Sequence, residues 1–76
     1  MKYTAIIEKT STGYSAYLPD VSGCVATGRT LSAVRRNIEE ALRFHLEGLQ
    51  IEGEPLPKPS AKVETLDISH RDLALA

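Results

Sequence analysis

One amphipathic segment constrains the fold of this chain more than any other feature of its sequence. After Thr30, a good N-cap residue, apolar side chains recur at intervals of three and four residues. They are Leu31, Val34, Ile38, Leu42, Leu46 and Leu49. This spacing predicts a long helix with one apolar stripe that ends between Gly48 and Gly53. Because one stripe needs one sheet face to bury it, we expect a two-layer α+β fold.

The residues before the helix predict an antiparallel meander of three strands. Residues 2–9 and 14–18 show the mixed period-2 pattern of strands, and the turn formers at residues 10–13 join them into a hairpin. Pro19 ends the second strand because it has no backbone N–H to donate. A short third strand is expected over residues 24–28.

The residues after the helix predict an extended connection and one more strand. Prolines at every second position of residues 55–59 favour an extended backbone. Residues 61–68 carry three large apolar side chains and predict a C-terminal strand, reached through a right-handed crossover. Ser69 with Asp72 predicts a cap for a final short turn over residues 70–76. The predicted order is therefore β-β-β-α-β.

Length and composition limit the number of domains and the class of partner. The 76 residues allow one domain, residues 1–76, whose small core is marginal without a partner surface. A formal net charge of -1 argues against a protein that binds nucleic acid mainly through a positive overall charge. The sequence contains neither an apolar run of the ~20 residues that a membrane span needs nor the apolar core of a signal peptide. We therefore expect a cytoplasmic protein that contacts no membrane.

The sequence holds few of the groups that catalysis or metal binding requires. A single cysteine, Cys24, excludes an internal disulfide, and the two histidines show no zinc-ligand spacing with it. A two-metal nuclease site needs clustered carboxylates, whereas the first strand has only Glu8. Cys24 and His45 would suit a nucleophile and its base, but a lone cysteine here is more often a small buried hydrophobe. We therefore predict no enzymatic activity, no cofactor and no metal.

The candidate partner-binding residues lie on the sheet face that one helix cannot cover and on the adjacent loop. Tyr14 and Tyr17 point to opposite faces of one strand, so we expect one beneath the helix and the other beside Ile6 on the open face. Such a face suits a partner, and a solvated open face is equally common. Asp20 and Val21, in the following loop, either only end the strand or also contact the partner. The uncovered apolar side chains also predict a homodimer or larger assembly.

Four short motifs of the chain resemble the HicB antitoxin family. They are GYSAYLPDVSGC at residues 13–24, GRT at 28–30, EEAL at 39–42 and EPLPKPS at 54–60. The first is the most specific. The resemblance implies a partial ribonuclease H-like fold with sheet order 3-2-1-4 and one main helix. It also implies an antitoxin that binds HicA, a small mRNA-cleaving endoribonuclease, and covers its catalytic surface.

The chain departs from the full-length family pattern at its C-terminal end. Family members that repress their own operon carry a DNA-binding domain after the last strand, and residues 69–76 are too few to form one. Direct DNA binding is therefore unexpected. Two functions follow from the sequence: an antitoxin that sterically inhibits a HicA-type toxin, or a stand-alone oligomeric module that binds a small ligand or nucleic acid without a toxin.

Overall fold

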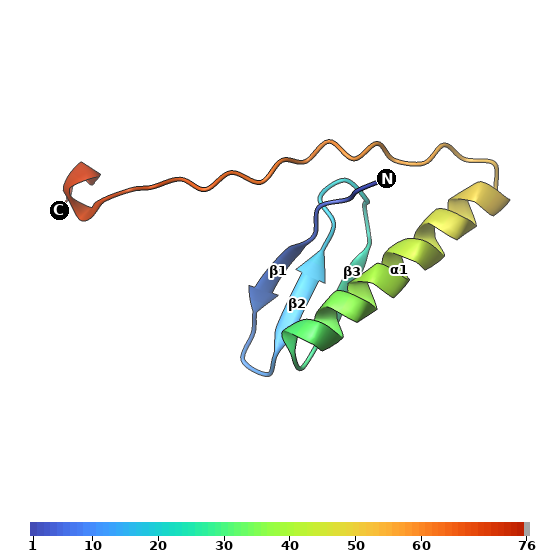
Figure 1. Cartoon of the computed structure of the whole chain (residues 1–76), viewed down its shortest axis with the longest axis horizontal. Coiled ribbons are helices and arrows are strands. Elements are labelled where there is room, and N and C mark those ends of the chain that lie inside the picture. Colours follow the sequence, from blue (N-terminus) through green and yellow to red (C-terminus); the bar gives the residue numbers. More distant parts are fainter. Residues whose placement is uncertain (76) are drawn as a thin grey trace.

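The computed structural model of the chain, which describes residues 1–75, places one helix across one face of a three-stranded sheet (Figure 1). The elements in chain order are β1 (Ile6–Lys9), β2 (Tyr14–Tyr17), β3 (Val25–Gly28), α1 (Leu31–Ile51) and the 3-10 turn η1 (His70–Asp72). The sheet is antiparallel with the order β1-β2-β3. Helix α1 packs against β3 and β2. This arrangement confirms the predicted two-layer α+β architecture and the meander.

The helix has well-defined ends, and both follow from local sequence. The Thr30 hydroxyl oxygen accepts the backbone N–H of Ala33 at 3.0 Å, which satisfies a donor that the first helical turn leaves free. At the other end Gly53 has a φ of 73°, in the left-handed region that favours glycine. There the N–H of Glu54 donates to the Leu49 carbonyl at 2.8 Å, and the chain leaves the helix. Within residues 1–75 no helix has the length and apolarity to cross a membrane.

The hydrophobic core lies between the inner face of the sheet and the first half of α1. Its six buried side chains come from β2, the loop after β2 and the helix: Ala16, Leu18, Val21, Cys24, Val34 and Ile38. Three of them belong to the loop between β2 and β3, whose backbone closes with hydrogen bonds from Val21 to Leu18 and from Cys24 to Val21. The loop is therefore a fixed part of the core.

The first strand is shorter than predicted, because it begins at Ile6 and not at Lys2. The residues just before it bond to the segment that follows the helix. The Tyr3 hydroxyl donates to the Pro57 carbonyl, and the Thr4 hydroxyl donates to the Ala61 carbonyl at 3.3 Å. Side-chain hydrogen bonds thus tie residues 3 and 4 to the segment that follows the helix.

The expected C-terminal strand is not found in the described chain. Residues 61–68 are extended, but they pair with none of the strands in the described chain, and they run away from the body toward η1 (Figure 1). The described sheet therefore has three strands and lacks the fourth position of the order 3-2-1-4. A strand exists only where a neighbouring edge satisfies its backbone groups, and this segment leaves the body without meeting one. The predicted cap of the final turn is confirmed, since the Ser69 N–H donates to the Asp72 carboxylate at 3.1 Å. The 3-10 turn covers His70–Asp72, and the last residue of the predicted span, 76, lies outside the described residues.

Candidate functional site

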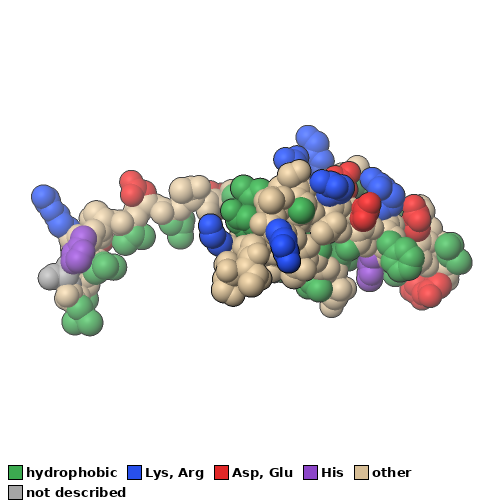
Figure 2. Space-filling model, turned by 90° about the horizontal axis from the view of Figure 1, so that it is seen from below, with side chains coloured by type: hydrophobic (Ala, Val, Ile, Leu, Met, Phe, Trp, Pro, Cys, Tyr) green, Lys and Arg blue, Asp and Glu red, His purple; other side chains and the backbone are tan. Residues whose placement is uncertain are grey.

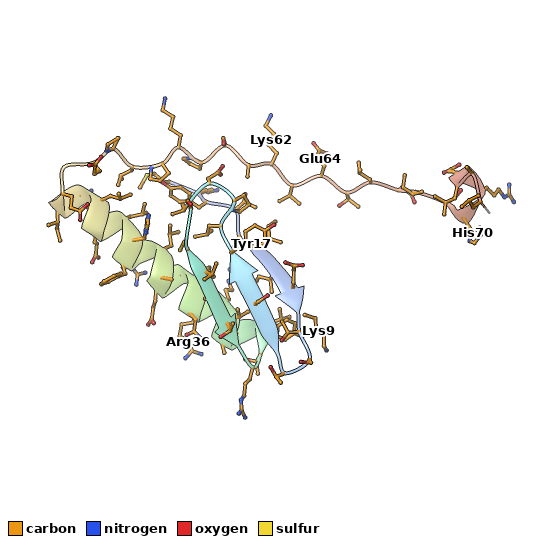
Figure 3. The ribbon with its side chains drawn as sticks, turned by 180° about the vertical axis from the view of Figure 1, so that it is seen from behind. Lys9, Tyr17, Arg36, Lys62, Glu64 and His70 are labelled. Atoms are coloured by element: carbon orange, nitrogen blue, oxygen red, sulfur yellow. The ribbon has the colours of Figure 1, made fainter. Side chains whose placement is uncertain are left out.

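The sheet face that points away from α1 carries a row of apolar side chains. Ile6 pairs with Tyr17, and Tyr17 pairs with Val25, so one side chain from each strand lies in a line across the sheet. Tyr17 is 43% exposed, Val25 is 67% exposed and Ile6 is half-buried. We call these three residues the Tyr17 row. Figure 3 shows Tyr17 at the end of β2, where the sheet meets the loop.

A second row of side chains on the same face is polar. Glu8 pairs with Ser15, and Ser15 pairs with Thr27, next to the Tyr17 row. The open face thus combines an apolar strip with a border of side chains that can form hydrogen bonds. Interfaces commonly have this arrangement, in which an aromatic centre is buried and a polar rim stays wet. Such a face is suited to contact with a protein surface.

The two tyrosines of β2 lie on opposite faces, as predicted. Tyr14 lies on the helix side with Ala16 and packs against the core. The Lys9 ammonium lies 5.7 Å from the centre of the Tyr14 ring, close enough for a cation–π contact. Tyr17 lies with Ile6 on the open side. Tyr17 is therefore accessible to a partner, whereas Tyr14 packs against the core.

Asp20 has a structural role that its sequence position did not reveal. One carboxylate oxygen accepts the backbone N–H groups of Ser60 and Ala61, each at 2.9 Å, and the other accepts the Ser60 hydroxyl at 2.9 Å. The N–H of Ala61, then the N–H and hydroxyl of Ser60, hold the pKa of Asp20 below its usual value, since all three donate to the charged form. The carboxylate thus ties the β2–β3 loop to the segment after the helix.

Val21 does not belong to an accessible contact surface. Its side chain is only 1% exposed, so a partner docked on the loop would not touch it. The prediction that Val21 contacts a partner is therefore corrected: the residue anchors the loop from beneath. Conversely, the sequence analysis missed Val25. The pairing register of β2 and β3 could have identified this residue, because it places Val25 beside Tyr17.

Cys24 and His45, the residues considered as a catalytic nucleophile and its base, lie in different surroundings. Cys24 is 4% exposed, and burial raises the pKa of its thiol, which favours the unreactive protonated form. This placement confirms the prediction that Cys24 is a core residue. His45 is half-buried on α1. Among residues 1–75, no three histidine, cysteine or acidic side chains gather into a group that could hold a metal ion.

The fold and this face define a small two-layer α+β module that presents an apolar row on an open sheet. Residues 3–72 match the model of the HicB_like antitoxin of bacterial toxin-antitoxin systems. The chain belongs to this family of antitoxins.

Relatives and solved structures agree with this assignment. The chain is 42% identical to a chain of a HicA3 and HicB3 toxin-antitoxin complex, with a TM-score of 0.67 over 79% of this chain and 70% of that one. It is 47% identical to a 14.9 kDa protein from the rep-hol intergenic region of Haemophilus phage HP1, over 76% of this chain and 44% of that protein. It is 37% identical to a UPF0150 protein of Thermoplasma acidophilum, over 87% of this chain and 97% of that protein. The chain thus spans less than half of the phage relative and nearly all of the archaeal one.

Proposed function

We propose that this chain binds a HicA-type mRNA-cleaving endoribonuclease and inhibits it by covering its catalytic surface. The observation that carries the proposal is the likeness, in sequence and in fold, to a chain of a HicA3 and HicB3 complex. The proposed inhibition is stoichiometric and steric, and the chain itself performs no chemistry. In support, the open sheet face offers a row of apolar side chains, one from each strand.

The Tyr17 row is the proposed centre of the contact. An exposed aromatic side chain flanked by Ile6 and Val25 can be desolvated by a flat partner surface, and buried aromatics often dominate interface energies. Asp20 supports this surface indirectly, because it holds the loop that follows Tyr17 against Ser60 and Ala61. We therefore assign contact to the row and positioning to Asp20.

The proposal includes two further properties of the chain. It acts in the cytoplasm, where a toxin that cuts mRNA would work, and it self-associates as a dimer or larger assembly. Self-association is supported by the large apolar side chains that the isolated chain leaves exposed on its sheet and on its C-terminal segment. We do not expect this chain to contact DNA directly.

A titration of toxin activity tests the proposed function. Increasing amounts of the purified chain are added to a HicA-type toxin from the same host, and cleavage of a labelled mRNA is followed. We expect activity to fall linearly and to stop at a fixed molar ratio, as tight stoichiometric binding requires. Unchanged cleavage at excess chain, with no complex by size-exclusion chromatography, would contradict the proposal.

The alternative, an oligomeric module without a toxin, is favoured by one observation. This chain spans 97% of the archaeal UPF0150 protein, so relatives with little beyond this module exist. Purification of the tagged chain from its native host separates the two functions. A small basic protein retained in fixed ratio supports the antitoxin, whereas a homo-oligomer that retains a small molecule or nucleic acid supports the alternative.

A further inference from the structure

Residues 62–75, here called the arm, project from the body with their large apolar side chains uncovered (Figures 1 and 2). The exposed fractions are 75% for Val63, 80% for Leu66, 64% for Ile68, 53% for Leu73 and 101% for Leu75. Exposed apolar residues are ordinary when scattered, but a series along one projecting segment marks an interaction site. The arm is therefore expected to be covered by another surface.

The residue just before the arm, Ala61, is held in place by hydrogen bonds at both its N–H and its carbonyl. The Ala61 N–H donates to Asp20, and the Ala61 carbonyl accepts the Thr4 hydroxyl at 3.3 Å. Upstream, the Tyr3 hydroxyl bonds to the carbonyl of Pro57, within the proline-rich connection. The arm thus starts from a fixed point beside the residues that precede β1. From there it continues away from the sheet of its own copy (Figure 1).

The outer edge of β1 could pair with an extended segment such as the arm. Strand β1 pairs with β2 on one side, and within residues 1–75 no strand pairs with its other side. Beside this edge an open groove separates β1 from α1, lined by Ile7, Leu31, Ser32, Arg35, Arg36 and Glu39. Ile7 and Leu31 are 37% and 54% exposed. An unpaired edge bordered by a groove with exposed apolar side chains is a site for one additional strand.

The arm and the groove complement each other in shape and in charge. In an extended segment Leu66 and Ile68 lie on the same face, so both can enter the groove beside Ile7. On the same face of the arm lies the acidic residue Glu64, two positions before Leu66, and the groove presents Arg35 and Arg36 on α1. Figure 3 shows Glu64 on the projecting arm and Arg36 on the helix of the same copy.

We propose that two copies of this chain exchange their arms. Residues 63–68 of each copy add as a strand along β1 of the other, with Leu66 and Ile68 in the groove between β1 and α1. The exchange is reciprocal, as a two-fold dimer requires, and it completes each sheet with a strand from the partner copy. The occupant is a second copy because the bonded root sends the arm away from its own β1. This inference rests on the proposed self-association and is independent of toxin binding.

Disulfide trapping between separately tagged copies tests the exchange. One full-length chain carries Ile7→Cys and the other carries Leu66→Cys, with Ile68→Cys as a second position for the register. The native Cys24 stays in place because it is buried. After co-refolding and mild oxidation, we expect a covalent heterodimer between the two tags, well above the yield from either variant alone. No heterodimer at either arm position would overturn the exchange.

The double variant Ile7→Cys with Leu66→Cys tells an exchanged arm from one that folds back. Exchange predicts covalent dimers on a non-reducing gel. A disulfide formed within single chains would overturn the proposal, because the arm would then cover its own β1.

A charge placed on the arm provides a second readout by light scattering. Leu66→Asp is expected to raise the dissociation constant of the dimer at least about tenfold, since the dimer would lose the burial of the leucine side chain beside Ile7. Thr65→Asp places the same charge on the opposite face of the arm and is expected to leave the dimer nearly unchanged. A parent chain that stays monomeric at micromolar concentration would contradict both the exchange and self-association. A dimer that Leu66→Asp leaves intact would contradict the exchange alone.

Discussion

The carboxylate of Asp20 accepts the backbone N–H of Ala61 at 2.9 Å, although the two residues are 41 positions apart in the chain. Through this bond and those to Ser60, the loop after β2 holds the segment that follows α1. The loop is itself part of the core through Val21. The core therefore determines where the C-terminal arm begins, and this linkage can be tested directly.

Replacing Asp20 by asparagine should release the root of the arm while leaving the core intact. The amide side chain is neutral and has only one acceptor oxygen, so it cannot serve all three donors of Ser60 and Ala61. We expect faster hydrogen exchange at the Ser60 and Ala61 amides and faster proteolysis near residues 57–61. Glu40→Gln, on the exposed side of α1, is the matched control. Parental exchange at both amides in Asp20→Asn would refute the assigned role.

The bonds to Asp20 also predict how stability depends on pH. The folded state lowers the pKa of this carboxyl, so the unfolded chain binds the proton more readily. The stabilisation is fully present above the unfolded pKa, about 3.9, and is lost as pH falls through the lower folded pKa. The difference in unfolding midpoint between the parent and Asp20→Asn should therefore shrink in acid. An Asp20 carbon-13 titration with a midpoint at or above the unfolded value would contradict this.

Two glycines should respond to alanine in opposite directions. A Cβ on Gly28 would meet the backbone of Val34 in the first turn of α1, with the Val34 Cα only 2.8 Å away. Gly28→Ala should therefore cost about 1–3 kcal/mol through overpacking. A Cβ on Gly48, within α1, would meet no atom within 4 Å. Gly48→Ala should therefore stabilise the folded protein by about 0.5–1 kcal/mol. Urea unfolding of the two variants measures both signs, and equal effects would refute the close approach of β3 and α1.

The thiol of Cys24 should be unreactive in the folded protein. It is buried, and its raised pKa keeps it protonated at neutral pH. We expect a thiol reagent to label Cys24 only as fast as the core opens, and completely in denaturant. Ser22→Cys adds an exposed thiol on the same loop and should label at once. Equal rates at the two positions under native conditions would show that the core is not closed.

Removing the ring of Tyr17 should weaken toxin binding strongly. Truncating a central interface aromatic typically costs about 2 kcal/mol or more, which corresponds to roughly thirtyfold in affinity. Tyr17→Phe keeps the ring and should bind nearly as the parent does, and Glu40→Ala on the helix should have little effect. Circular dichroism first confirms that each variant is folded. Parental affinity in Tyr17→Ala would place the contact away from the open sheet face.

The helix and the faces of the strands were predictable because their signals are local. Thr30 and Gly53 bound α1 as predicted, since a cap and a left-handed turn depend on residues a few positions apart. Tyr14 and Tyr17 lie on opposite faces because strand side chains alternate with a period of two. The family motifs added the antitoxin class, which the residue pattern alone left open.

The tertiary structure decided what depends on distant partners. Val21 looked like an accessible loop residue, but it is buried because the loop folds onto the core. Asp20 bonds to Ser60 and Ala61, a pairing that no local spacing encodes. Residues 61–68 have strand-like side chains, yet a strand also needs an edge to pair with, and only the folded chain shows where that edge lies. The sequence by itself determined which segments are helical or extended; long-range contacts decided which surfaces they cover.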